Sequence, residues 1–230
     1  MQLNESLVER ILCDILARTV SEGLLPQTPS AAAVAAPVDP YLVPVGVSNR
    51  HIHLSRADMD ALFGPGASLT RMKAMKQPGH YAAKETVTLK GPKGELSKVR
   101  VLGPMRGSTQ VEISVADGFS LGVRPPLRQS GDLDDTPGIE IVGPHGAVTI
   151  QRGVIAALRH IHMPVAVAVD LGLCSGDAVD VEVSGPRGGI LSGVVVRVGD
   201  PSTLEMHVDI EEANALGLKN DDLVRILPRS

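Results

Sequence analysis

Two copies of one tetrapeptide, Arg-His-Ile-His, stand far apart in this chain, at residues 50–53 and 159–162. A second pair of similar segments follows them. The segment "LKGPKGELSKVRVLGP" at 89–104 resembles "VSGPRGGILSGVVVRVGDP" at 183–201, and in both halves a Ser-Thr pair comes shortly afterwards. Self-similarity in a fixed order indicates that one supersecondary unit occurs twice. The body of the chain is therefore predicted to consist of two related units.

The residue pattern of both units predicts β-strands. Runs such as "ETVTLKG", "KVRVLG", "TQVEISV" and "GVVVRVG" are rich in β-branched residues, and Gly, Pro, Asn and Asp separate them, as is typical of strands joined by turns. Short helices are predicted at Arg56–Phe63, Val165–Leu171 and Glu211–Leu216. The chain is expected to be mainly β, with two related small β-barrel domains, residues 45–145 and 146–230, and short capping helices.

The N-terminal residues differ from this body. Apolar residues recur at spacings of three and four over residues 1–20, with charged residues on the other side, which predicts an amphipathic helix. Residues 21–44 are rich in Ala and Pro and almost uncharged, as is typical of a flexible linker. A helix docked on its own domain is the alternative, but such a helix rarely needs a tether of about 20 residues. We expect a detachable docking peptide that binds a partner.

Composition excludes several function classes. A formal net charge of −4 and an aromatic content of 2% provide neither the basic surface nor the stacking side chains that nucleic-acid binding uses. No apolar run reaches the ~20 residues of a membrane span, and no basic leader precedes an apolar stretch as in a secretory signal. Two cysteines make no disulfide framework. We expect a cytoplasmic protein that binds neither nucleic acid nor membranes.

The histidines of the two tetrapeptides have the spacing of metal ligands. In a strand, alternate side chains share a face, so His51 and His53 lie on one side and Ile52 on the other. Glu112 and His207 follow the Ser-Thr pairs at nearly equivalent points. The prediction is one metal site of His51, His53 and Glu112 and a second of His160, His162 and His207. Three protein ligands with an open position are the composition of a catalytic site.

One pair of histidines alone would more often be a chance pair or a hydrogen-bonded core feature. Two identical tetrapeptides, each with a matched third ligand, reverse that judgement. Zinc is the first choice for imidazole-rich sites, and cobalt or nickel also fit. If the two units are related by approximate symmetry, the two sites are expected to lie close together in one cleft. His80 and His145 stand beside glycines and are expected to be solvated.

Arg106 stands six residues before Glu112. Its guanidinium could hold a phosphate or carboxylate through two points, and an exposed turn arginine is an equal alternative. Ser130, in "RPPLRQSGD", has no basic partner nearby in the sequence and is not expected to be a nucleophile. Cys174 has no adjacent His or cationic residue that would stabilise a thiolate, and Cys13 belongs to the predicted helix at 1–20, so neither is a good candidate for carrying an acyl group.

Several of these segments together resemble a known family. They are "VPVGVSNRHIHLS", "QPGHYAAKETVTLKGPKG", "VRVLGPMRGSTQVEIS", "LRQSGD", "GVIAALRHIHMP" and "DIEEANALGL". In this order they look like the PduL-type phosphotransacylases, also called phosphate propanoyltransferases. The resemblance runs from about residue 44 to the C-terminus, and no predicted metal-binding position departs from it.

The resemblance implies two β-barrel domains with a dimetal site between them, which exchanges coenzyme A and phosphate on a short acyl group. The motif match assigns one zinc to His51, His53 and Glu112, the other to His160, His162 and His207, and the phosphate to Arg106. Coenzyme A contacts are expected in matching segments, at Val45, Gly46, Val47, Lys90, Arg100 and Asn214. Family members that work inside bacterial microcompartments also resemble this chain in having an amphipathic encapsulation helix and a linker. The expected location is then the microcompartment lumen, with shell or lumen proteins bound through residues 1–20; a homo-oligomer is compatible with this.

The expected reaction is acyl-CoA plus phosphate to acyl phosphate plus coenzyme A, with propanoyl-CoA as the first choice of substrate. One metal and Arg106 would bind phosphate, a metal would polarise the thioester carbonyl, and no acyl-enzyme is needed. A zinc-dependent hydrolase of a thioester is the first alternative, because such sites also activate water. The second is a non-catalytic metal-binding module that its tail recruits to an assembly.

Overall fold

A computed structural model describes residues 39–228 of the chain; the predicted helix at 1–20 and most of the linker lie outside these residues. The described chain is mainly β, as predicted. It falls into two compact units. The barrel unit contains the described residues up to Gly46, Arg159–His207 and those from Ala215 onward, and the sheet unit contains Val47–Leu158 and Val208–Asn214. Between residues 39 and 228 no helix has the length and apolar character needed to cross a membrane.

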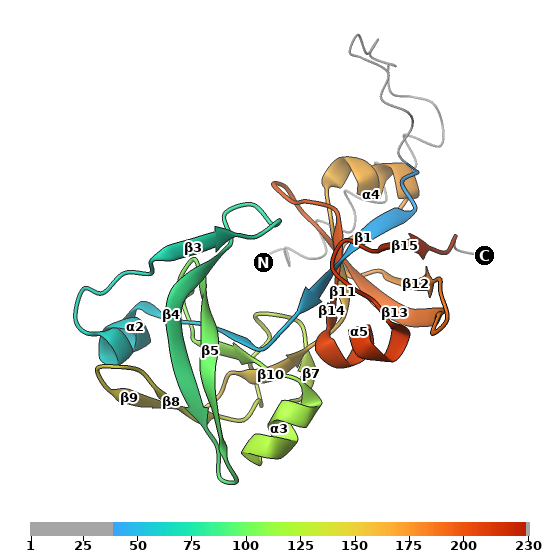
Figure 1. The fold of residues 1–230 in the computed structure, drawn as a ribbon. Coiled ribbons are helices and arrows are strands. Elements are labelled where there is room, and N and C mark those ends of the chain that lie inside the picture. The colour runs from blue at the N-terminus through green and yellow to red at the C-terminus, as the bar shows by residue number, and fades with distance from the viewer. Residues whose placement is uncertain (1–38, 229–230) are drawn as a thin grey trace, which may run out of the picture. The chain divides into compact units, whose positions relative to one another are not determined.

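The barrel unit is built on a closed barrel of six strands in the order β1, β14, β11, β13, β12, β15. In Figure 1 these strands run from blue (β1) to orange and red. Along β12 and β15 buried and exposed residues alternate, so one side of each strand faces the barrel interior. The bounds are β1 Leu42–Ser48, β11 His160–Met163, β12 Ala178–Val183, β13 Gly189–Val198, β14 Glu205–Asp209 and β15 Leu223–Ile226, and helix α4 is Val165–Leu171.

The sheet unit is a half-barrel rather than a second closed barrel. Its strand path is β7, β10, β6, β2, β5, β4, β8, β9, with β3 paired to β4. Within the described residues this path does not close on itself, because no pairing joins β7 to β9. The bounds are β2 His51–His53, β3 Arg71–Ala74, β4 Tyr81–Lys90, β5 Glu95–Gly103, β6 Gln110–Glu112, β7 Leu127–Arg128, β8 Ile139–Val142, β9 Ala147–Ile150 and β10 Val154–Ala157, with helices α2 Arg56–Phe63 and α3 Val115–Leu121.

The duplication is present in the strand pairing. In the sheet unit β2 is parallel to β5 and antiparallel to β6, and β4 and β5 form an antiparallel pair. In the barrel unit β11 is parallel to β13 and antiparallel to β14, and β12 and β13 form an antiparallel pair. A helix follows the first and the last strand of each set, the final one being α5, Ile210–Leu216. Each Arg-His-Ile-His therefore occupies the same topological position in its half.

The compact units divide the chain at Leu158 and Arg159, whereas the sequence-based division lies between residues 145 and 146. β9 and β10 fall between the two boundaries, and they pair with β8, β6 and β7. The local sequence does not indicate the boundary between the two units, because β9, β10 and their turns have the same composition as their neighbours on both sides.

Helices α2, α4 and α5 lie where the sequence predicts them, whereas α3 was not predicted. Gly118 in its centre lowers helix propensity. Two caps outweigh this: Ser114 and Asp117 form a capping box, and the Glu211 carboxylate accepts hydrogen bonds from the first backbone N–H groups of the helix at 3.1 and 2.9 Å. An acceptor at a helix N-terminus satisfies donors that have no partner within the helix.

Candidate functional site

Strands β2 and β6 build the first candidate site. Their antiparallel register places His51 opposite Glu112 and His53 opposite Gln110. One ligand atom from each of His51, His53 and Glu112 lies within 4.8 Å of the others, and all three residues are buried. The structure thus brings together the three residues that the repeat assigned to one site, here called the glutamate trio.

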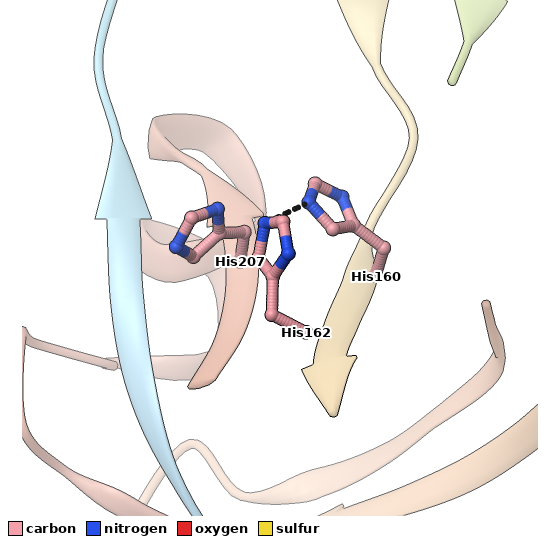
Figure 2. A group of neighbouring side chains, drawn as sticks. All are labelled: His160, His162 and His207. Carbon is pink, nitrogen blue, oxygen red and sulfur yellow. Dashed lines mark hydrogen bonds between the residues drawn. The ribbon is translucent and has the colours of Figure 1, made fainter. Parts of the chain in front are cut away.

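Strands β11 and β14 build the second candidate site in the same way. His160 lies opposite His207 and His162 opposite Glu205. The rings of His160, His162 and His207 face one another (Figure 2), and their ligand atoms also lie within 4.8 Å of one another. His160 Nε2 and His162 Nε2 are 3.1 Å apart. These residues, the second predicted set, are here called the histidine trio.

The electrostatics of one histidine in each trio suit a metal ligand. Burial, with the charges of His51 and Arg106, lowers the pKa of His53 to about 3. Burial, with the charges of His160 and His207, lowers the pKa of His162 to about 3. Both imidazoles are therefore neutral at pH 7, which is the form that binds a metal. His53 Nδ1 is also buried without a hydrogen-bond partner among the described residues, which is costly unless another group occupies its lone pair or proton.

His51 and Glu112 compensate each other's charge. His51 Nδ1 lies 2.8 Å from Asn49 O and so donates to it, which turns Nε2 toward Glu112 Oε2 at 3.4 Å. Burial lowers the pKa of His51, but the charge and hydrogen bond of Glu112 outweigh it, and the pKa is raised overall. Burial by itself would raise the pKa of Glu112, but the positive charge of His51 holds this pKa well below its usual range. The buried carboxylate therefore stays ionised beside His51. The raised pKa of His51 favours its protonated form, and a metal bound at its Nε2 would have to displace that proton.

A hydrogen-bond network joins Arg106 to the glutamate trio. Arg106 Nη1 donates to Ser130 Oγ at 2.8 Å, and Ser130 Oγ donates to Glu112 Oε1 at 3.2 Å. Gln110 Nε2 donates to Glu112 Oε1 at 2.5 Å and to Ser130 Oγ at 2.8 Å, while its Oε1 accepts from the Gly131 N–H at 2.7 Å. Arg106 is half-buried, so it is not a simple exposed turn arginine. Sequence reasoning missed Gln110 and the linking role of Ser130.

The loop that carries Arg106 is tied to the start of α2. Arg106 N donates to Leu54 O at 2.9 Å, and Ser55 N donates to Thr109 Oγ1 at 2.9 Å. Ser55 Oγ donates to Asp58 Oδ2 at 2.8 Å, and the Thr109 hydroxyl donates to the same oxygen. These contacts hold both ends of the short segment between β5 and β6, so the backbone that carries the Arg106 guanidinium is fixed in position.

A cavity of about 340 Å³ opens beside this network. Arg106 and Gln110 lie in its wall, and Arg152, which pairs with Asp134 at 2.6 Å, lies there too. The cavity is large enough for a small anion and part of a larger substrate. Its lining residues are Arg106, Gly107, Ser108, Gln110, Gly131, Asp132, Leu133, Asp134 and Arg152.

The residues expected to contact coenzyme A have varied environments. The side chain of Val45 is buried in the barrel unit, and its N–H and C=O pair with Asp222 and Asp221. Val47 is half-buried, and Lys90 and Asn214 are exposed. Arg100 Nη1 donates to the carbonyls of Ala83 and Lys84 at 3.0 and 2.8 Å. Gly46 lies against Glu205 and His207. The coenzyme A contacts stay a prediction.

Two further histidines have different surroundings. His145 is exposed, as expected. His80 is half-buried, and its charge is among the smaller causes, after burial, of the lowered pKa of His53. His80 thus lies close enough to the glutamate trio to affect it, which its position beside a glycine did not indicate.

Comparisons with known proteins identify the family of the chain. The family model described as phosphate propanoyltransferase matches residues 44–219, a range that contains both trios and Arg106. The chain belongs to the phosphate propanoyltransferase family. It is 62% identical over 222 residues to the phosphate propanoyltransferase of Rhodobacter capsulatus, covering 96% of this chain and 97% of the relative. It is also 62% identical over 226 residues to that of Rhodopseudomonas palustris, covering 98% and 99%.

A third phosphate propanoyltransferase, from Salmonella typhimurium, is 51% identical over 179 residues, which cover 77% of this chain and 85% of the relative. Membership of the phosphate propanoyltransferase family makes the chain an acyltransferase. The resemblance seen in the motifs is therefore confirmed over most of the chain.

Proposed function

We propose that this member of the phosphate propanoyltransferase family catalyses the reversible reaction of a short-chain acyl-CoA with phosphate to give acyl phosphate and coenzyme A, with propanoyl-CoA as the acyl donor. The names of the similar enzymes support this choice of substrates. The observation that carries the proposal is the connection of Arg106 through Ser130 to the glutamate trio. This connection supports a fork of anion-binding donors next to the buried residues that we propose as metal ligands.

Each trio would hold one divalent metal ion, with Zn²⁺ as the first choice and Co²⁺ or Ni²⁺ as alternatives. The donor sets support this: two imidazoles and a carboxylate in one trio, three imidazoles in the other, all ligand types that Zn²⁺ accepts. The buried Nδ1 of His53, which has no hydrogen-bond partner between residues 39 and 228, also supports a bound cation. When bound, such an ion supplies Lewis acidity toward a carbonyl or phosphoryl oxygen.

Arg106 is the residue proposed to bind phosphate. A guanidinium offers a planar fork of donors that matches two oxygens of a phosphate. Ser130 engages one arm of this fork and so orients the rest of the group. The adjoining cavity of about 340 Å³ is the proposed place of the phosphate. Holding phosphate and thioester at fixed positions converts a reaction between two molecules into one within a single complex.

The chemistry needs no covalent enzyme intermediate. An oxygen of the bound phosphate attacks the carbonyl carbon of the thioester, the carbon–sulfur bond breaks, and coenzyme A leaves as its thiolate. Ser130 is engaged by Arg106, Gln110 and Glu112, a position suited to orientation rather than to nucleophilic attack. In the reverse direction the coenzyme A thiolate attacks the acyl phosphate and phosphate leaves.

Incubation of the full chain with propanoyl-CoA, with and without phosphate, tests the reaction. We expect coenzyme A release that requires phosphate, with acyl phosphate trapped as a hydroxamate by hydroxylamine. Release that ignores phosphate would support the hydrolase instead, and the absence of any acyl phosphate would support the non-catalytic module. Acetyl-CoA and butanoyl-CoA in parallel define the chain-length preference. Arg106→Lys should raise the KM for phosphate, whereas Arg187→Lys, at an exposed position, should not.

For the N-terminal residues we propose encapsulation in a bacterial microcompartment, with residues 1–20 binding shell or lumen proteins and the residues from 21 up to β1 acting as the linker. Residues 42–44, which the sequence assigned to the linker, belong to β1 and pair with β15. The amphipathic pattern of residues 1–20 supports this proposal. The alignments with the Rhodobacter and Rhodopseudomonas enzymes cover 96% and 98% of this chain and so extend into this region. Fusion of residues 1–20 to a fluorescent protein should give discrete foci in cells that produce microcompartments. Leu7→Glu combined with Ile11→Glu should make the fluorescence diffuse; diffuse fluorescence of the unchanged fusion would contradict the proposal.

A further inference from the structure

A buried glutamate lies behind the histidine trio. Glu205 is 5% exposed, and its Oε2 lies 2.9 Å from His207 Nε2. The two residues are two positions apart on β14 and so project from the same face of the strand. A carboxylate buried at this depth is stable only with a close donor or cation, and the imidazole N–H is such a donor.

The contact determines which nitrogen of His207 faces the other histidines. Figure 2 shows one ring nitrogen of His207 toward His162 and His160 and the other directed away from them. Because Nε2 is engaged by Glu205, the nitrogen that faces the trio is Nδ1. A carboxylate accepts but does not donate, so Nε2 carries the proton and Nδ1 presents a lone pair.

The other half of the chain has an equivalent contact with the chemistry reversed. Gln110 lies opposite His53 in register, as Glu205 lies opposite His162. Gln110 Nε2 donates to Glu112 at 2.5 Å. In both trios the third member is thus held by the residue two positions before it. An amide donor holds the carboxylate, and a carboxylate acceptor holds the imidazole.

Gly46 leaves the space that the pair needs. A Cβ on Gly46 would lie 2.8 Å from Glu205 Oε1 and 2.9 Å from His207 Cδ2. The backbone there is outside the left-handed region, so the requirement for glycine is steric rather than conformational. β1 therefore approaches the Glu205–His207 pair as closely as a backbone without a side chain permits.

We propose that Glu205 is the positioning residue of the histidine trio, fixing the ring and tautomer of His207 so that Nδ1 is presented to a divalent metal ion. This inference rests on the metal sites proposed above. Outer carboxylates that hold a histidine ligand typically change metal affinity about 10- to 100-fold when removed. Each site then contains one buried carboxylate, as a direct ligand in the glutamate trio and behind a ligand in the histidine trio.

The test compares full-length wild type with Glu205→Ala and Glu205→Gln after loading with Zn²⁺ and removal of excess metal. The measurements are Zn²⁺ per chain and the rate of Zn²⁺ transfer to a chromogenic chelator. We expect two equivalents in the wild type, and one of the two released about 10- to 100-fold faster from Glu205→Ala. Glu205→Gln should fall between them, because its amide oxygen still accepts the Nε2 proton. Glu182→Gln, an exposed change on β12, should match the wild type.

Two further measurements separate positioning from a general loss of structure. Gly46→Ala should accelerate release of the same equivalent by displacing the pair, whereas Gly199→Ala, whose Cβ would meet nothing within 4 Å, should not. Two-bond ¹H–¹⁵N spectra should show His207 protonated at Nε2 in the wild type and a mixture of tautomers in Glu205→Ala.

Each outcome distinguishes the two levels of the proposal. Wild-type protein that holds no Zn²⁺ would overturn the metal sites and, with them, the role of Glu205. Wild type with two equivalents, together with Glu205 variants that release both at the wild-type rate, would overturn the role of Glu205 alone. If Glu205→Ala does not fold, Glu205→Gln and Gly46→Ala still decide the question.

Discussion

Arg106 donates a 2.8 Å hydrogen bond to the hydroxyl of Ser130, and through it the guanidinium is linked to Glu112. This bond restricts the rotation of the Arg106 guanidinium, so less conformational freedom is lost when a phosphate binds. The same hydroxyl also accepts from Gln110. Ser130 therefore connects Arg106, the proposed phosphate-binding residue, to the proposed metal ligands of the glutamate trio.

Ser130→Ala should raise the KM for phosphate and lower kcat, with little effect on the KM for propanoyl-CoA. Hydrogen bonds to charged groups contribute about 1.5–3 kcal/mol, so kcat/KM for phosphate should fall ~10- to 100-fold. Steady-state kinetics with each substrate varied in turn measure this. Ser120→Ala, which loses only a bond to a helix carbonyl, is the control. Unchanged phosphate kinetics in Ser130→Ala would remove the orienting role.

The two trios predict separable metal losses. His53→Ala should abolish one of the two Zn²⁺ equivalents and His160→Ala the other, because each removes one of three clustered residues proposed as ligands. Both should lose activity, while the exposed His145→Ala should keep metal and activity. Metal analysis of purified protein, followed by the phosphate-dependent assay on the same samples, provides both values. Full turnover by a metal-free variant would exclude a role of metal in the reaction.

The isoleucines between the paired histidines should stabilise the fold rather than take part in the reaction. Ile52 and Ile161 are fully buried, on the face of the strand opposite the histidines. Ile52→Ala should lower the free energy of unfolding by about 2–5 kcal/mol. Ile190→Ala, at a residue that is 58% exposed, should change it by less than about 0.5 kcal/mol. Equal effects in urea unfolding would show that Ile52 is not part of the core.

The cap that Glu211 provides for α3 should be measurable. Its carboxylate accepts from Val115 N and Ala116 N, and the negative charge also favours a helix N-terminus. Glu211→Gln should lower the free energy of unfolding by about 0.3–1 kcal/mol, whereas Glu95→Gln, exposed on β5, should not. Thermal unfolding followed by circular dichroism compares them. A Glu211→Gln protein as stable as the wild type would show that Ser114 alone suffices.

The metal-free protein should lose stability in acid. An unfolded histidine titrates near pH 6.5, whereas burial and its neighbours lower the pKa of folded His162 to about 3. Between these pH values the unfolded chain binds a proton that the folded chain does not, so stability falls as the pH is lowered through this window. Urea unfolding in chelator from pH 7 to 4 should show a smaller fall for His162→Asn. The exposed His145→Asn should retain the wild-type fall; equal falls for both variants would contradict the assignment.

The trios could be predicted from sequence because they depend on strand alternation and a repeat, both of which are local patterns. The partners Gln110 and Glu205 could not, because their role becomes visible only when the register places them opposite His53 and His162. The register also explains why Glu112 and His207 differ by one residue in their distance from the Ser-Thr pairs. Position in the strand pair, rather than distance along the loop, defines the site.

Other differences between the sequence-based prediction and the structure also arise from long-range contacts. Helix α3 contains Gly118 and is capped by Glu211 from a distant part of the sequence, so its local sequence underestimates its stability. Closure of a barrel depends on whether the first and last strands of a path pair. No periodicity within a single strand contains that information, and the prediction of two similar barrels could not distinguish a closed one from the half-barrel.

Both trios are assembled by backbone pairing between adjacent strands, with no loop residue among the six side chains. A slip of one residue between β2 and β6, or between β11 and β14, would turn Glu112 or His207 to the opposite face of the sheet. A misaligned half could then form much of its ladder and still lack a third ligand. Metal retention would therefore report, separately for each half of the chain, whether folding reached the correct alignment.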